Sequence, residues 1–363
     1  MSEERAFNFS AGPAVMPLPV LKKIQEELLC LPGCGASILE ISHRSKQFGE
    51  ILARTKQNVK DLLGVPDNYQ IMFLQGGALT HFAMLPMNLL RSTGKSGNYL
   101  VTGNWSKKSA SEAKTQGKVD VVWDGKAEGY VRKPTDDEIK LTDDALYCYF
   151  CANETIEGIQ YPREPKVDVP LICDASSEIF SRPVDIEKYG VLFACAQKNA
   201  GPAGVVLVIM RDDFVEMSGD DLPSMFSYKK LAEKDSMLNT PPTFGIYSMA
   251  LVTDWLKEQG GLEAMAALNR EKASLLYDAI DGSNGFYRVH GQKEYRSVMN
   301  VSFRTPSEEL DKEFQEEAKK VGLTNLNGHR SVKGERASIY NAMPREGVVA
   351  LRDFMVDFAQ KKG

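Results

Sequence analysis

Short apolar runs alternate with segments of helical periodicity through the first two thirds of the chain. The segment SKQFGEILARTKQNVKDLLG (residues 45–64) carries apolar residues at helical spacing, and Gly64 suits the C-terminal cap of that helix. YQIMFL (69–74) has the continuous apolar character of a buried strand. It breaks at Gly76-Gly77, before a second helical segment, ALTHFAMLPMNLL (78–90).

Further apolar runs of strand length follow, and helical or polar segments separate most of them. They are NYLVTG (98–103), KVDVVW (118–123), ALYCYFC (145–151), VPLICD (169–174), VLFACAQ (191–197) and GVVLVIM (204–210). Strands that are apolar without alternation are typical of a parallel sheet buried on both faces. The pattern therefore predicts an α/β fold, with a mostly parallel sheet covered by helices.

The pattern changes near residue 260, where a long helical segment precedes a few strand-like pieces and two more helices. This texture is typical of a smaller α+β domain, and 363 residues exceed what one hydrophobic core usually organises. We predict a large cofactor-binding domain over residues 16–262 and a small C-terminal domain over residues 263–363. An N-terminal arm, residues 1–15, would join the small domain. The polar segment 124–144 predicts a surface excursion.

The composition limits the partners and the compartment. A net charge of −5 argues against a nucleic-acid or membrane-surface partner, because both require a basic face. No apolar run reaches the length of a membrane span, and the N-terminus MSEERAFNFSAGPA resembles neither a secretory signal nor a transit peptide. Cys148 and Cys151 form a CxxC motif inside a strand-like run, without a second CxxC or a nearby histidine. We therefore predict no metal site and a reducing, cytoplasmic environment.

Polar residues gather where the predicted strands end. They are Gln75-Gly76-Gly77-Ala78, Asn104-Trp105-Ser106, Asn153-Glu154-Thr155, Asp174-Ala175-Ser176-Ser177 and Gln197-Lys198. In open α/β sheets, ligands bind beyond the carboxyl ends of the strands. Each group alone has an ordinary structural reading, such as a turn, a helix cap or a lysine reaching solvent. Together they supply an anion cup, an aromatic plate, a carboxylate, a hydroxyl and a lysine, which are the requirements of pyridoxal phosphate.

At this point the sequence resembles the phosphoserine aminotransferase family of fold-type I pyridoxal-phosphate enzymes. The resemblance runs from Phe7 to about Asn341, and its most specific parts are AQKNAGPAG (196–204) and GHRSVKGERASIYNA (328–342). It implies that Lys198 forms the Schiff base with the cofactor and shuttles the substrate proton. It also implies a homodimer in which the two subunits share each active site.

The family pattern assigns further roles by position. Asp174 would pair with the pyridine nitrogen, Trp105 would stack on the ring, and Thr155 would hydrogen-bond the phenolic oxygen. The cofactor phosphate would be held by the N–H groups of Gly77 and Ala78, by Gln197, and by Asn239 and Thr240 of a second subunit. Ala78 departs from the bacterial pattern, which places an arginine there, so one cationic contact is absent from the phosphate cup.

Two basic clusters stand out in this acidic chain, and the resemblance implies that they bind the anionic groups of the substrate. They comprise His43, Arg44, His329, Arg330 and Arg336. Each cluster alone reads as a solvated basic loop. A keto acid that carries both a carboxylate and a phosphate nevertheless needs two anion sites, and arginine binds both groups bidentately.

The resemblance implies transamination of 3-phosphohydroxypyruvate with glutamate, giving O-phosphoserine and 2-oxoglutarate in serine biosynthesis. Three alternatives stay open on the residues alone. They are another aminotransferase of the same fold, such as one that uses alanine and glyoxylate, a cysteine desulfurase, and a non-catalytic relative. The presence of Lys198, Asp174 and Trp105 together disfavours the last.

Overall fold

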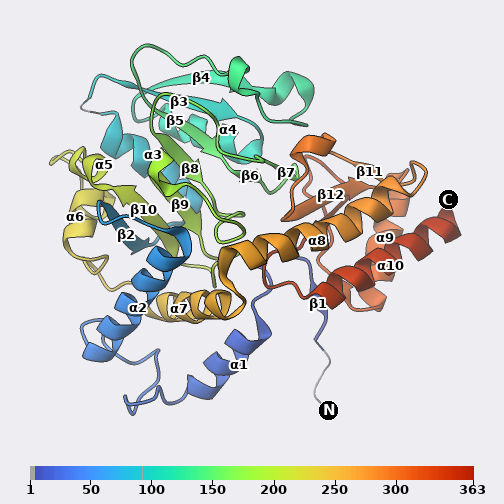
Figure 1. Cartoon of the computed structure of the whole chain (residues 1–363), viewed down its shortest axis with the longest axis horizontal. Helices are drawn as coiled ribbons and strands as arrows, with labels where there is room; N and C mark the ends of the chain where they lie inside the picture. The colour runs from blue at the N-terminus through green and yellow to red at the C-terminus, as the bar shows by residue number, and fades with distance from the viewer. Residues whose placement is uncertain (1–4, 92) are drawn as a thin grey trace.

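The computed structural model describes residues 5–91 and 93–363, so the first four residues of the predicted arm lie outside it. Its centre is a seven-stranded sheet (Figure 1). In spatial order the strands are β2 (Tyr69–Leu74), β10 (Val206–Arg211), β9 (Tyr189–Cys195), β8 (Leu171–Asp174), β5 (Ala145–Cys151), β3 (Ser96–Val101) and β4 (Lys118–Asp124). Only β10 runs antiparallel to its neighbours in this sheet, which confirms the predicted mostly parallel arrangement.

Helices cover both faces of this sheet, and each face has its own apolar core. One face carries α1 (Leu18–Glu27), α2 (Lys46–Leu63) and α7 (Thr243–Glu258), and the other carries α3 (Gly77–Leu89), α4 (Asn104–Ala113), α5 (Asp212–Glu216) and α6 (Tyr228–Glu233). Along β9, Leu192 packs into the first core and Phe193 into the second. Because both sides of the strand are buried, its sequence is apolar at every position. Gly64 caps α2 in the left-handed conformation, with φ of 63°, as its position predicts.

A smaller sheet and two helices form a second body around a third core, on the right in Figure 1. Its strands are β11 (Arg288–Val289), β12 (Asn300–Arg304) and β14 (Glu335–Ser338), and its helices are α9 (Glu308–Lys320) and α10 (Arg345–Lys362). In addition, β1 (Phe7–Asn8) of the N-terminal arm pairs in parallel with β13 (Leu323–Thr324) of this body. The remaining short elements are β6 (Asn153–Glu154), β7 (Ile159–Gln160) and 3₁₀ turns at Gly125–Glu128, Asp136–Glu138, Ile186–Lys188, Ser224–Phe226 and Lys293–Tyr295.

The long helix α8 (Gly261–Asp281) passes from one body to the other (Figure 1). Leu262, near its start, packs in the core of the large sheet, whereas Leu276, near its end, packs in the core of the small one. We therefore propose that the two domains divide near residue 262, with α8 as the element they share.

The segment 124–144 is not wholly a surface excursion, and that prediction is wrong for Lys133. Its side chain is fully buried, and its Nζ donates to Thr102 Oγ1 at 3.1 Å and to the Cys151 carbonyl at 3.3 Å. The ammonium also lies 4.7 Å from the centre of the Tyr161 ring. Burial lowers the pKa of Lys133. A buried lysine is tolerated when such acceptors surround it, and a local polar composition cannot reveal them.

Within the described residues, no helix combines the length and the apolar character needed to cross a membrane. The helices that are long enough instead bury one face against a sheet or another helix, as α2 does through Phe48, Leu52 and Val59.

Lys272 of α8 joins the helix to the end of the small sheet. Its side chain is fully buried, and its Nζ donates to the carbonyls of Ile339, Tyr340 and Met343 at 3.1, 2.8 and 3.1 Å. These carbonyls belong to the turn that follows β14. One side chain therefore donates to three buried carbonyl groups of that turn.

Replacing this lysine tests that role. Lys272→Met keeps most of the side-chain volume but removes the lysine donor from the three carbonyls, of which that of Tyr340 keeps the Met343 N–H at 2.9 Å. The free energy of unfolding should therefore fall by about 1–3 kcal/mol. Lys312→Met, at an exposed position of α9, is the matched control and should change it by less than about 0.5 kcal/mol. Equal denaturation midpoints for the two variants would contradict the assignment.

Candidate active site

A cavity of about 300 Å³ lies beyond the carboxyl ends of the parallel strands. It brings together eight of the residues that the sequence singles out, from both domains: Ala78, Trp105, Thr155, Asp174, Gln197, Lys198, His329 and Arg336. Ala11 and Gly12 of the N-terminal arm also line it. Its volume lies at the lower end of the range for small-molecule sites.

Lys198 follows β9, whose residues are all buried, so the strand holds the lysine at a fixed place above the sheet. Its Nζ donates to Thr155 Oγ1 at 2.6 Å and lies 5.3 Å from the centre of the Trp105 ring. The backbone of the N-terminal arm lies close to the same side chain, since a Cβ placed on Gly12 would stand 3.3 Å from Lys198 Cγ. The lysine is therefore held between a hydroxyl, an aromatic ring and a close backbone.

Asp174 ends β8 and is almost completely buried. Its Oδ1 accepts hydrogen bonds from Ser176 N at 2.9 Å and from Ser176 Oγ at 2.5 Å. Burial raises the pKa of this carboxyl, while the positive charge of Lys198 lowers it. Asp174 is therefore a carboxyl group of fixed position that lines the cavity, and the charge of Lys198 partly offsets the effect of burial on its pKa.

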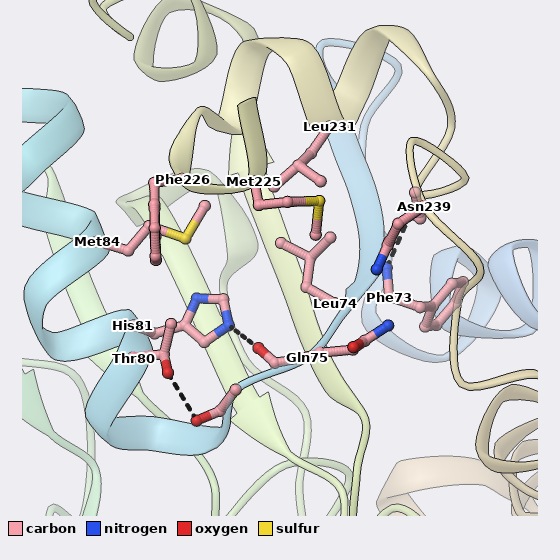
Figure 2. A pocket seen from close by; sticks show the side chains of 12 residues that line it. Phe73, Leu74, Gln75, Thr80, His81, Met84, Met225, Phe226, Leu231 and Asn239 are labelled. Atoms are coloured by element: carbon pink, nitrogen blue, oxygen red, sulfur yellow. Dashed lines mark hydrogen bonds between the residues drawn. The ribbon is translucent and has the colours of Figure 1, made fainter. Parts of the chain in front are cut away.

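The anion cup is predicted at the start of α3. Gly76 precedes the helix in a left-handed conformation, with φ of 93°, and a Cβ there would lie 2.5 Å from Thr80 Oγ1. Thr80 Oγ1 donates to the Gly76 carbonyl at 2.9 Å, which closes the turn (Figure 2). The first N–H groups of a helix have no intrahelical partner and favour an anion, and Ala78 of this first turn lines the cavity.

These groups fit pyridoxal phosphate. The cavity offers a lysine amine, a buried carboxyl, an aromatic face and a glycine-preceded helix N-terminus, which match the cofactor's aldehyde, ring nitrogen, ring face and phosphate. Trp105 supports the same conclusion, because its ring already lies against Lys198.

Two buried glutamates hold the helix that carries Trp105, and sequence reasoning assigned a role to neither. Glu154 accepts from Trp105 N at 3.0 Å through Oε2 and from Ser106 Oγ at 2.5 Å through Oε1. Glu157 Oε1 accepts from Asn104 N at 3.0 Å and from Asn104 Nδ2 at 2.6 Å. Carboxylates are favourable at a helix N-terminus. The two glutamates in the polar run after β5 were therefore a signal from which an interaction with a helix N-terminus could have been predicted.

Glu157 also connects the large domain to the small one. The Asn104 amide that it holds donates to Ser331 Oγ at 3.3 Å, and that hydroxyl lies 2.7 Å from His329 Nδ1. The second carboxylate oxygen of Glu157, Oε2, is buried without a hydrogen-bond partner among the described residues. Burial and the neighbouring Glu154 raise the pKa of Glu157 to about 8.

Several predicted site residues do not line this cavity: His43, Arg44, Gly77, Asn239, Thr240 and Arg330. Gly77 adjoins Ala78 at the start of α3. Asn239 instead lines a second cavity, of about 230 Å³, together with Gln75 and Gly76 (Figure 2). Gln75 Nε2 donates to the Thr240 carbonyl at 3.2 Å, so this exposed polar tip lies beside the anion cup and outside the main cavity.

Lys108 lines the main cavity although the sequence gave no reason to select it. It lies one turn after Trp105 on α4, and its Nζ is 4.7 Å from the centre of that ring. Its spacing from Trp105 by three residues puts both side chains on one face of α4 once the helix is known.

Comparisons with known proteins agree with this geometry. Residues 6–351 match the class-V aminotransferase family. The phosphoserine aminotransferase of Rhodopirellula baltica is 53% identical over 361 residues, which cover 99% of this chain and 96% of that protein. The solved phosphoserine aminotransferase from Bacillus circulans subsp. alkalophilus has a TM-score of 0.97 and 46% identity, and the match covers 99% of this chain and 100% of that one. The PLP-bound phosphoserine aminotransferase of Trichomonas vaginalis has a TM-score of 0.91 and 41% identity, with 97% and 99% covered.

The raised pKa of Glu157 gives a prediction for stability against pH. Between about pH 4.3, where an exposed glutamate titrates, and about pH 8, the folded chain keeps a proton that the unfolded chain releases. The free energy of unfolding therefore falls as pH rises through this window. Glu157→Gln removes that loss, so its stability relative to wild type should improve with pH, by up to about 1.4 kcal/mol per unit.

Denaturant titrations at pH 5, 6.5 and 8 measure this difference. Glu258→Gln, at an exposed position of α7, is the control, and its difference from wild type should stay constant over the same range. A constant difference for Glu157→Gln as well would show that Glu157 is ionised in the folded protein throughout.

Proposed function

Because the chain belongs to the class-V aminotransferases, and within them to the phosphoserine aminotransferase family, we propose that it transfers the amino group of glutamate to 3-phosphohydroxypyruvate. The products are O-phosphoserine and 2-oxoglutarate, in serine biosynthesis. The observation that carries this proposal is the convergence of Lys198, Thr155, Asp174 and Trp105 on one cavity that also contains Arg336.

The cofactor would be held by this chain's residues at several points. Asp174 would bind the ring nitrogen, Trp105 the ring face and Thr155 the phenolic oxygen. Gly77, Ala78 and Gln197 would bind the phosphate, and Lys198 would attach the cofactor covalently. When bound, pyridoxal phosphate supplies an electron sink for the bonding electrons at the substrate Cα.

The chain's own groups position the substrate and move its proton. Lys198 is the base within this cavity, and its bond to Thr155 Oγ1 fixes where the amine stands. Arg336 would bind a substrate anion: its guanidinium lines the cavity, and its Nε is buried without a partner among the described residues. Trp105 and the arm residue Gly12 also line the cavity.

Three alternatives from the sequence are less well supported. The 53% identity to a phosphoserine aminotransferase favours that family over the alanine and glyoxylate enzymes of the same fold. A cysteine desulfurase needs a mobile nucleophilic thiol, whereas Cys195, the cysteine that lines the cavity, is buried at the end of β9. A non-catalytic relative has no use for a lysine placed between Thr155 and Trp105.

We extend the proposal to a homodimer in which each subunit completes its partner's site. Asn239 and Thr240 are exposed beside the anion cup but outside their own chain's cavity, so a second subunit could receive them. Exposed Met225 and Phe226 adjoin this tip in the second cavity, and an exposed apolar patch is typical of an interface (Figure 2). His43 and Arg44 also do not line their own chain's cavity, and we include them in the proposed contribution to the partner's site.

A cytoplasmic location is part of the same proposal. The six cysteines are free thiols in this structure, and four of them are buried in or beside the large sheet. Unpaired cysteines suit a reducing compartment.

The assignment of Lys198 is tested by covalent labelling. Lys198→Ala should abolish transamination between phosphoserine and 2-oxoglutarate, because no other cavity residue supplies an amine at that position. Borohydride treatment of the wild-type holoenzyme should fix the cofactor on the peptide that contains Lys198, and the variant should carry no label. Lys188→Ala, at an exposed lysine in the 3₁₀ turn before β9, should retain both properties. Label on a different lysine of the wild type would refute the assignment.

Sharing between subunits is tested by mixing two inactive parents, Lys198→Ala and the double variant Asn239→Ala/Thr240→Ala. If the tip serves the partner's site, each mixed dimer has one intact site and one site with both defects. Dissociation and reassociation of an equal mixture should then restore about a quarter of wild-type activity. Each parent reassociated alone is the control. If lysine and tip belong to the same site, the mixture stays as inactive as its parents.

A further inference from the structure

A chain of hydrogen bonds leads from Lys198 away from the cavity and into the protein. Lys198 Nζ donates to Thr155 Oγ1 at 2.6 Å. Thr155 Oγ1 in turn donates to Ser177 Oγ at 3.0 Å, and Ser177 Oγ donates to the Asn153 carbonyl at 2.8 Å. Thr155 and Ser177 are each 3% exposed and Asn153 is 1% exposed, so partners within the protein decide where the hydroxyl protons lie.

The carbonyl at the end of this chain fixes its direction. A carbonyl oxygen can only accept, and a serine hydroxyl has one proton, so the proton of Ser177 lies toward Asn153. The Asn153 Nδ2 group donates to Ser177 Oγ at 2.8 Å and to Asn300 Oδ1 at 2.7 Å, which orients that amide. Ser177 Oγ therefore has only acceptor capacity left for Thr155, and the one proton of Thr155 lies toward Ser177.

The two neighbouring serines act on different residues of the site. Ser176 Oγ donates to Asp174 Oδ1 at 2.5 Å and accepts from Cys195 N at 3.0 Å. Ser176 is among the residues that line the cavity, and Ser177 is not. Ser177 therefore reaches the site through Thr155.

With its proton toward Ser177, Thr155 presents lone pairs to the cavity. A neutral amine has two N–H groups and one lone pair, and the lone pair takes up a proton or attacks a carbonyl carbon. An acceptor at Thr155 binds an N–H group of Lys198 and leaves that lone pair available. A threonine hydroxyl that could rotate freely would be able to donate to the lone pair and block it. For the same reason, Thr155 would bind the cofactor's phenolic oxygen as an acceptor of its proton.

We propose that Ser177 is a positioning residue for the reaction, which holds the proton of Thr155 and so makes Thr155 an acceptor toward Lys198. The inference rests on the proposed function for the attachment of the cofactor at Lys198. The direction of the hydrogen bonds itself needs only the four residues of the chain.

The experiment measures the pH at which the visible band of the lysine-bound cofactor titrates in each holoenzyme. Ser177→Ala frees the proton of Thr155 to turn toward the cavity, where it stabilises the deprotonated form of the cofactor and lysine. The midpoint should therefore fall by about one pH unit, which is the size of one hydrogen bond. Ser177→Thr keeps the hydroxyl and should keep the wild-type midpoint. Ser177→Cys changes the volume least and should shift the midpoint in the same direction as alanine, since sulfur is a weak acceptor.

The matched control is Ser248→Ala on α7, a buried serine whose Oγ donates to the Phe244 carbonyl at 2.8 Å, and it should titrate as the wild type does. All variants keep the other titratable and charged groups around Lys198, which are Asp174, Cys151 and Cys195 and the cavity residues Lys108, His329 and Arg336. A change confined to the Ser177 variants therefore reports the hydrogen-bond chain.

A double variant separates this role from a merely structural one. In a Thr155→Val background the hydroxyl is gone, so adding Ser177→Ala should move the midpoint by less than about 0.3 pH unit. A full shift from Ser177→Ala in that background would overturn the role of Ser177, as would a wild-type midpoint in both Ser177→Ala and Ser177→Cys. A wild-type enzyme whose visible band titrates as described but which does not transaminate phosphoserine would overturn the proposed function and leave the role of Ser177 in place.

Discussion

Burial of the central strands on both faces is the constraint on which the rest of the structure depends. Residues of β9 alternate between two apolar cores, so no polar group can be placed along the strand without a loss of stability. Chemistry is therefore confined to the strand ends, where Asp174 ends β8 and Lys198 follows the neighbouring strand β9. The same rigidity fixes the amine of Lys198 against Thr155 Oγ1, which a lysine on a flexible loop could not maintain.

Three buried carboxyl groups then organise the space above the strand ends. Asp174 lines the cavity, and the positive charge of Lys198 lowers its pKa. Glu154 and Glu157 instead accept hydrogen bonds from backbone N–H groups at the N-terminus of α4. Glu157 further connects α4 to the segment of His329 through the Asn104 amide. Trp105 and the segment of His329 are thus held by one hydrogen-bond network, so the position of one depends on the other.

The sequence predicted the elements whose cause is local. Continuous apolar runs identified the strands of the large sheet, and Gly64 identified the end of α2, because burial and a left-handed cap leave direct marks in the residue pattern. The position of Lys198 at a strand end was equally visible. The order of the seven strands could not be predicted, because it depends on pairing between segments far apart in the chain. In that order β10 lies antiparallel between β2 and β9.

The features that sequence reasoning missed depend on tertiary contacts. Lys133 looked like part of a polar surface segment, yet Thr102 Oγ1 and the Cys151 carbonyl receive its ammonium inside the protein. Lys108 looked like an ordinary exposed lysine, and only the fold brings it to the same cavity as Arg336. The positions of Asn239 and Thr240 outside that cavity likewise follow from the path of the chain beside Gln75.

The cavity is expected to carry out amino transfer from a phosphorylated amino acid. The most direct test is a single half-reaction: the holoenzyme is mixed with phosphoserine in the absence of any keto acid, and the visible absorbance of the bound cofactor is followed. The visible band of the lysine-bound cofactor should disappear, with about one equivalent of 3-phosphohydroxypyruvate released per subunit. An unchanged spectrum with phosphoserine, together with a rapid change on addition of alanine, would contradict it.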